Sequence, residues 1–125
     1  MEYSIFSDLG NREINEDYVE AFKAPAGNVF ALADGLGGHG GGEIASKTAV
    51  ETVKKVFQNN DRENVEVVLA DAFENAHNML KKLQNETNEE NFFKTTLVVL
   101  VVRENEYIWA NIGDSRLYHF ENNVL

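Results

Sequence analysis

The feature that most constrains this chain is a run of glycines between an apolar segment and a periodic one. Six of the eight residues at 35–42 are glycine, and Asp34 stands directly before them. The apolar run 29–33 is typical of a strand, and the segment 44–57 has the apolar spacing of a helix. Glycine costs backbone entropy, so such a run is expected where the backbone approaches a ligand or adopts positive φ. The pattern predicts a strand that delivers a carboxylate to a glycine turn, which opens into a helix.

Three interpretations of this turn compete. Gly35, Gly37 and Gly40 match the spacing of a dinucleotide-binding fingerprint. A Rossmann unit, however, needs a second strand about 20 residues later that ends in an acid, and here the chain after Phe57 becomes polar and then helical. No Gly-Lys-Ser/Thr follows the glycines, so a P-loop is excluded. A purely structural turn remains open, but Asp34 favours a cation as the ligand.

Composition limits the class of protein. The 125 residues are one domain's length at most, and 43% are hydrophobic, which is enough for a modest core. The formal net charge of −10 argues against binding to nucleic acid or an anionic membrane. With no cysteine, disulfides and thiolate metal sites are excluded. The sequence shows neither a signal peptide nor a membrane span, so we expect a cytoplasmic location.

Acidic residues recur at places that a hairpin would bring together. Arg12 precedes Glu16 and Asp17, which open a predicted strand at 18–22, and the turn signal at 25–28 joins it to the strand that ends before Asp34. In an antiparallel hairpin the start of one strand lies beside the end of the other, so Glu16, Asp17 and Asp34 would converge. Such carboxylates repel unless a cation neutralises them. Taken alone, the cluster at 12–17 is more typical of a solvated charged loop.

The rest of the chain predicts mixed helices and strands. An apolar stripe defines a second helix over 65–83, with His77 and Met79 at its surface or core edge, and 85–91 is expected to be a polar loop. The β-branched run 95–102 predicts one unbroken strand covered on both faces. Gly113, Asp114, Ser115 and Arg116 place another acid at a strand end, where a tight polar turn is an equal alternative. The remaining strands are expected at 3–7, 107–112 and 117–120, and Ile44 is expected on the buried face of the first helix.

Three motifs together resemble the PP2C-type (PPM) family of metal-dependent protein serine/threonine phosphatases, especially its bacterial branch. The first is Ser7-Asp8-x-Gly10 followed by Arg12-x-x-Asn15-Glu16-Asp17. The second is Ala33-Asp34-Gly35-Leu36-Gly37-Gly38-His39 with Gly42-Glu43-x-Ala45-Ser46. The third is Thr95-Thr96 with Gly113-Asp114-Ser115-Arg116 and Tyr118. Each motif is weak alone, whereas their joint order and spacing are specific.

The resemblance implies a role for each candidate site residue. Asp34 would bridge two Mn²⁺ or Mg²⁺ ions, with Glu16 and the Gly35 carbonyl as further ligands. Asp17 would orient the metal shell, and Asp114 would help to hold a third, weaker ion. Hard cations of this kind prefer carboxylate and carbonyl oxygens.

The resemblance also implies how the substrate phosphate is handled. Arg12 would hold it while a metal-activated water attacks phosphorus in line. Many family members carry a histidine directly after Asp-Gly, whereas Leu36 stands at that position here. His39 is the substitute candidate for protonating the leaving group, and a role in positioning the glycine turn is an equal alternative.

The fold class expected is α+β, with antiparallel β-sheets flanked by two long helices as part of a four-layer α-β-β-α sandwich. Residues 1–125 would be the N-terminal part of a single phosphatase domain whose C-terminal half, with its remaining metal ligands, is absent. The expected substrate is a protein phosphorylated on serine or threonine by a kinase, and the chain alone would be weak or inactive. Exposed strand edges would favour self-association. The alternative function is a non-catalytic regulatory or interaction module of the same descent.

Overall fold

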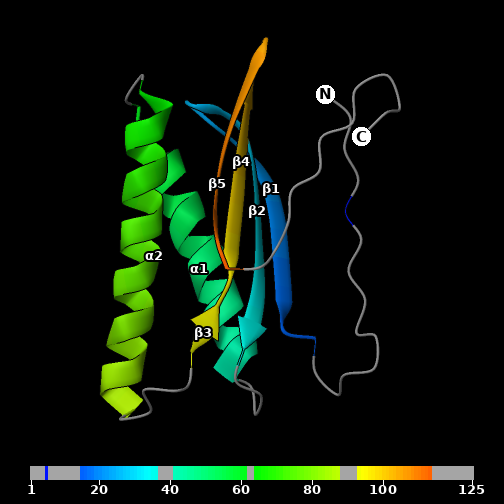
Figure 1. The fold of residues 1–125 in the computed structure, drawn as a ribbon. Coiled ribbons are helices and arrows are strands. Elements are labelled where there is room, and N and C mark those ends of the chain that lie inside the picture. Colours follow the sequence, from blue (N-terminus) through cyan, green and yellow to red (C-terminus); the bar gives the residue numbers. More distant parts are fainter. Residues whose placement is uncertain (1–4, 6–14, 37–40, 62–63, 88–92, 114–125) are drawn as a thin grey trace.

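The computed structural model describes residue 5 and residues 15–36, 41–61, 64–87 and 93–113. Two helices lie on one side of an antiparallel sheet (Figure 1), which confirms the α+β class. The strands predicted at 3–7, apart from Ile5, and at 117–120 lie outside the described residues. The elements in chain order are β1 (Asp17–Ala24), β2 (Gly27–Leu36), α1 (Gly41–Gln58), α2 (Val65–Thr87), β3 (Lys94–Thr95), β4 (Leu97–Arg103) and β5 (Glu106–Ile112).

The predicted hairpin is formed by β1 and β2. Its turn consists of Pro25 and Ala26, and Gly27 adopts φ of 142°, a value that favours glycine. The register runs from Ala24 opposite Gly27 at the turn to Asp17 opposite Asp34 at the open end. β2 continues to Leu36, so Asp34 and Gly35 belong to the strand and not to the glycine turn, contrary to the prediction. The carboxylate is therefore held on regular sheet backbone.

The sheet has the strand order β1-β2-β4-β5, and the short β3 also pairs with β2. A two-residue turn, Glu104 and Asn105, joins β4 to β5. The single strand predicted at 95–102 is wrong in one respect, because the pairing is interrupted at Thr96 and leaves β3 and β4 as separate strands. The interruption lies beside Asp34, whose carbonyl accepts a hydrogen bond from Thr96 N–H at 2.9 Å.

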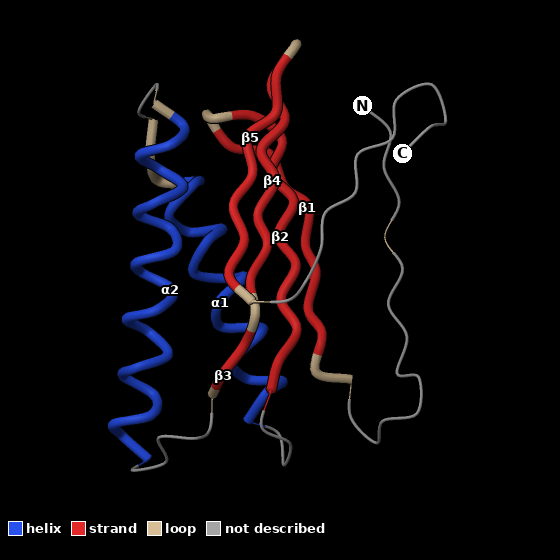
Figure 2. The backbone as a smooth tube through the Cα atoms, in the orientation of Figure 1, coloured by secondary structure: helices blue, strands red, loops and turns tan. Residues whose placement is uncertain are grey.

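Helix α1 lies against the sheet (Figure 2). Its buried face consists of small and apolar side chains. Ile44, expected on that stripe, is 49% exposed. The buried face is instead displaced toward Ser46 and Val50, since the helix begins three residues earlier than predicted and is oriented by its glycines. The buried residues of α1 are Gly41, Gly42, Ala45, Ser46, Ala49, Val50, Val53 and Phe57.

An ion pair fastens α1 to β1. Lys54 Nζ lies 2.6 Å from Glu20 Oε1, and the ammonium stands 6.0 Å from the centre of the Phe22 ring. The hydrogen bond to the Glu20 carboxylate, together with its charge, raises the pKa of Lys54 above its usual value. Phe22 also meets Phe57 edge to face, with ring centres 6.5 Å apart. One polar and one aromatic contact thus fix the helix on the first strand.

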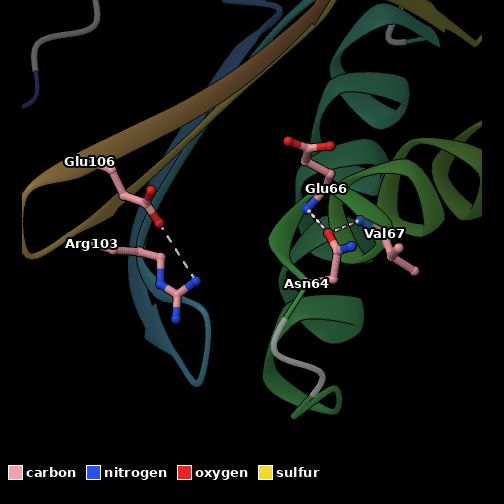
Figure 3. Close-up of polar contacts among 5 residues, drawn as sticks. All are labelled: Asn64, Glu66, Val67, Arg103 and Glu106. Carbon is pink, nitrogen blue, oxygen red and sulfur yellow. Dashed lines mark hydrogen bonds and ion pairs between the residues drawn. The ribbon is translucent and has the colours of Figure 1, made fainter.

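Helix α2 packs against α1 and begins with a side-chain cap. Asn64 Oδ1 accepts hydrogen bonds from Glu66 N–H at 3.0 Å and from Val67 N–H at 3.3 Å (Figure 3). The helix continues to Thr87, so part of the loop predicted at 85–91 is helical. Both His77 and Met79 are exposed, within the range of placements expected for them. None of the described helices is long and apolar enough to span a bilayer.

The core lies between the helices and one face of the sheet. In β2 the buried residues alternate, with Val29, Ala31, Ala33 and Gly35 toward α1. The intervening residues, including Leu32 and Asp34, occupy the opposite face. Asp34 is thus on the side of the sheet that the two helices leave uncovered.

Candidate metal centre

The structure describes four of the seven predicted site residues. Glu16, Asp17, Asp34 and Gly35 all lie at the open end of the β1–β2 hairpin. Arg12, His39 and Asp114 lie outside the described residues. The predicted hairpin thus places these four residues at one end of the sheet, and the site roles of all seven stay predictions.

Asp17 and Asp34 are directly opposite each other in the β1–β2 ladder. Residues at paired positions share a face of the sheet, and like charges placed so are destabilising. Asp17 is exposed, whereas Asp34 is half-buried and its Oδ1 is shielded from solvent. A positive group beside the pair, either a metal ion or a guanidinium, would lower the electrostatic cost.

Glu16 joins this end of the hairpin mainly through its backbone. Its carbonyl accepts a hydrogen bond from Gly35 N–H at 3.0 Å. Its carboxylate lies against Gly42, where an added Cβ would overlap Glu16 Oε2. Gly42 is in the first turn of α1, and the start of a helix favours a negative charge.

The expected convergence of three carboxylates is therefore wrong in its detail. Asp17 and Asp34 are paired, but Glu16 directs its carboxylate to the start of α1. Across the residues that the structure describes, no group of three or more histidine or acidic side chains is arranged to hold a metal ion. The physical reason is the alternation of a strand, since neighbours such as Glu16 and Asp17 point to opposite faces.

Gly35 has a reason to be glycine that the sequence did not reveal. A Cβ on Gly35 would overlap the backbone of Gly42, including its carbonyl oxygen. The end of β2 and the first turn of α1 are thus in direct backbone contact. Asp34 and Gly35 are consequently fixed relative to the helix that follows the glycine turn.

Thr96 belongs to the third motif of the family resemblance, but the sequence predicted no role for it. It is buried, and three hydrogen bonds join it to the backbone of Asp34, the longest from Thr96 Oγ1 to the Asp34 carbonyl at 3.5 Å. Thr96 N–H donates to the Asp34 carbonyl at 2.9 Å, and Thr96 Oγ1 accepts from Asp34 N–H at 3.1 Å. The signal that could have found it is a polar residue directly before the apolar run 97–102.

The donors present fit a hard divalent cation. Carboxylate and backbone carbonyl oxygens are the ligands that Mg²⁺ and Mn²⁺ prefer, and Mg²⁺ commonly takes one or two carboxylates and keeps several waters. Asp17 and Asp34 supply such oxygens on one face of the sheet, and Gly35 adds a carbonyl beside them. This part of the chain can hold part of an ion's coordination shell.

A surface hollow lies at the other end of the sheet, away from Asp17 and Asp34. Its volume is about 810 Å³, and it is bounded by the two tight turns, residues 25–28 and residues 102–106. The Arg103–Glu106 ion pair, with a separation of 3.8 Å, lies on its rim (Figure 3). Size alone does not make it the site, because the paired carboxylates are at the opposite end of the β1–β2 hairpin.

Comparison with known proteins identifies relatives over nearly the whole chain. Protein phosphatase PhpP of Streptococcus pneumoniae is 33% identical over 122 residues, which cover 94% of this chain and 49% of that protein. Serine/threonine phosphatase stp of Listeria monocytogenes is 31% identical over 126 residues, which cover 91% of this chain and 47% of the relative. The chain thus spans about half the length of these curated relatives.

Solved structures agree with the sequence relatives. The catalytic domain of the serine/threonine protein phosphatase PstP, in complex with two manganese ions, matches with a TM-score of 0.81 and 29% identity. The match covers 94% of this chain and 50% of the PstP chain. The serine/threonine phosphatase of S. agalactiae matches with a TM-score of 0.73 and 28% identity, covering 90% of this chain and 48% of that one.

The family model for protein phosphatase 2C matches residues 7–124. The match includes the hairpin that pairs Asp17 with Asp34, the two helices and the strands that follow them. This chain belongs to the protein phosphatase 2C family.

Proposed function

We propose that this chain supplies part of the active centre of a metal-dependent phosphatase that acts on phosphoserine and phosphothreonine in proteins. The observation that carries the proposal is the cross-strand pair of Asp17 and Asp34, with the Asp34 backbone held by Thr96. It is supported by relatives that are serine/threonine phosphatases and by a matching structure that contains two manganese ions.

The proposed ligands follow the family pattern. Asp34 would hold two Mn²⁺ or Mg²⁺ ions, and Glu16 and the Gly35 carbonyl would be further ligands. Asp17 orients the metal shell, and Asp114 helps to hold a third ion. For Glu16 to serve in this way, its carboxylate would have to leave Gly42 and reach the face of the sheet that carries Asp34.

Hydrolysis of the phosphate ester assigns separate roles to the metal ions, Arg12 and His39. When bound, the metal ions supply an activated water and neutralise charge on the phosphate. Arg12 binds the phosphate oxygens, on which negative charge accumulates during transfer. His39 protonates the departing serine or threonine oxygen. The substrate is a protein phosphorylated by a serine/threonine kinase, and the proposed location is the cytoplasm.

A second candidate function is a non-catalytic regulatory or interaction module. It is favoured by the lack, in the described ranges, of any cluster of three metal-ligating side chains. Under the phosphatase proposal, the same observation means that the chain alone binds metal loosely and turns over slowly, because metal catalysis requires a fixed coordination shell.

Metal binding tests the proposal directly. We expect Asp34→Asn to weaken Mn²⁺ binding by at least ~10-fold in titration calorimetry, the loss typical of a disturbed metal shell. Asp61→Asn, on the exposed segment between the helices, removes the same charge elsewhere and is the matched control. The variant should also lower Mn²⁺-dependent hydrolysis of p-nitrophenyl phosphate and of a phosphothreonine peptide.

Two results would contradict the proposal. Unchanged Mn²⁺ affinity in Asp34→Asn would remove Asp34 from the metal centre. Tight Mn²⁺ binding without turnover of either substrate, in this chain and in a form of the length of its relatives, would favour the interaction module.

A further inference from the structure

We infer that Thr96 is a positioning residue for the metal centre, which acts by fixing the backbone of Asp34 and through it two proposed metal ligands. The inference rests on the proposed function, because it concerns how Asp34 and Gly35 are presented to the ions. Thr96 would touch neither metal nor substrate. Its task would be to set the direction in which β2 offers its oxygens.

Both backbone polar groups of Asp34 are held by this one residue. The Asp34 carbonyl accepts from Thr96 N–H at 2.9 Å, and Asp34 N–H donates to Thr96 Oγ1 at 3.1 Å. The two residues are 62 positions apart in the chain. The contact is therefore a tertiary clamp on Asp34 and not a local turn.

The clamp replaces regular sheet pairing at this point. β2 pairs with β3 through Gly35 and Leu36, and with β4 through residues 28–32. Between those ladders, Thr96 lies outside both strands, and its hydroxyl supplies the acceptor that a strand carbonyl would otherwise provide. A valine here would keep the shape of the side chain but leave Asp34 N–H without that acceptor, in a region where an unmade hydrogen bond is costly.

The orientation of the Thr96 side chain is restricted by Gly113, the residue that follows β5. Gly113, directly after β5, has φ of 104°, a conformation that favours glycine. A Cβ on Gly113 would lie 2.8 Å from Thr96 Cβ and closer still to its methyl group. The end of β5 therefore restricts the Thr96 rotamer, and Thr96 itself is only 4% exposed.

Rotation of the Asp34 peptide would move two proposed ligands together. The Asp34 carboxylate and the Gly35 carbonyl are on consecutive residues, and Gly35 is already in contact with Gly42. The contact with Gly42 fixes the end of β2 relative to α1. On the other side, toward β3 and β4, the hydrogen bonds of Thr96 restrict rotation of the Asp34 backbone. Loss of its hydroxyl should disturb metal binding more than it disturbs the fold.

The test compares Thr96→Val, which lacks the hydroxyl, with Thr96→Ser, which keeps it. We expect Mn²⁺ affinity, measured by calorimetry and by paramagnetic resonance of free Mn²⁺, to fall at least ~10-fold in Thr96→Val and to stay within ~3-fold in Thr96→Ser. Thr52→Val is the matched control, because it makes the same substitution at a partly buried threonine whose hydroxyl donates only within α1, to the Thr48 carbonyl at 2.7 Å.

A second readout does not depend on metal. Hydrogen exchange of the Asp34 amide, followed by NMR, should quicken in Thr96→Val and not in Thr96→Ser or Thr52→Val. If Thr96→Val fails to fold, Thr96→Cys replaces it, since a thiol is a weak acceptor of similar size to the serine hydroxyl.

The outcomes separate the two proposals. Wild-type Mn²⁺ affinity in a folded Thr96→Val, or equal losses in the serine and valine variants, would overturn the positioning role. Absence of Mn²⁺ binding in the unaltered chain and in Asp34→Asn alike would instead overturn the proposed function, while the amide exchange would still decide whether the Thr96 hydroxyl holds Asp34.

Discussion

At the level of single residues, the end of β2 is defined by contacts that leave no room for a methyl group. Gly35 meets the backbone of Gly42, and Gly42 meets the carboxylate of Glu16 as well as the Gly35 carbonyl carbon. The glycines that matter most here serve close approach of backbone to backbone. Neither has a φ in the left-handed region.

We expect Gly35→Ala to destabilise the chain by roughly 1–3 kcal/mol, the usual cost of forcing extra volume into a packed site. Gly42→Ala should cost less, since its nearest neighbour is the end of the flexible Glu16 side chain. Thermal unfolding followed by circular dichroism measures both. Equal melting temperatures for Gly35→Ala and the unaltered chain would show that the strand and helix separate at no cost.

At this scale the sequence predicted which residues lie at the end of the hairpin, but not how their side chains are directed. Asp34 stood out because a carboxylate before six glycines has few structural explanations. The clamp by Thr96 could not be predicted, because it joins residues 62 positions apart and depends on a break in a run that reads as one strand. Glu16 was assigned correctly to this end of the hairpin, yet the direction of its carboxylate depends on the register of α1, which no local pattern specifies.

At the scale of elements, the hairpin and the two helices followed their local signals closely. Pro25 and Gly27 specified the turn of β1–β2, and apolar periodicity specified α1 and α2. The errors are at boundaries. α2 continues to Thr87, whose hydroxyl donates to the Leu83 carbonyl, and Ile44 is exposed because burial in α1 is set by the contact of its glycines with β2.

The ion pair between α1 and β1 should weaken at alkaline pH, where Lys54 loses its proton. The hydrogen bond to Glu20 raises the folded-state pKa of Lys54 above 10.5. The stability that protonated Lys54 contributes is therefore fully present below pH 10.5. It is lost as pH rises through the folded-state pKa. We expect Lys54→Met to lower the melting temperature slightly, by a difference that is constant over roughly pH 6–9 and shrinks above about pH 10.5.

The measurement is a series of thermal melts of both chains across this pH range. Lys47→Met, on an exposed position of α1, is the control for loss of charge. Since both partners are partly exposed, about 1 M salt should reduce the difference. A difference that grows with alkaline pH would mean that the ion pair does not hold α1 to β1.

At the scale of the whole molecule, the sheet has one covered face and one that carries exposed apolar side chains. On the face opposite the helices, Leu32 is 36% exposed, Leu36 48% and Trp109 46%. Exposed apolar side chains that gather on one face mark interaction sites or aggregation-prone regions. Whole relatives of about twice this length have additional chain with which to cover such a face.

Self-association therefore stays a prediction, now carried by this face as well as by strand edges. We expect dimers or larger species at micromolar concentration in sedimentation velocity, together with binding of an apolar dye. Leu32→Gln combined with Trp109→Gln should reduce both, and Ile44→Gln on the exposed side of α1 is the matched control. A monomer that binds no dye would contradict the prediction.

The tight turn between β1 and β2 also bears on the order in which the site is assembled. Hairpins of this kind close within about 1–10 μs, because few residues separate their strands. The pairing of Asp17 with Asp34 closes a shorter loop than the contact of Thr96 with Asp34, which spans 62 positions, so it has the lower entropic cost. The acidic pair is then exposed to ions before its backbone is locked, so divalent cations in the folding medium can act on the nascent hairpin as well as on the finished protein.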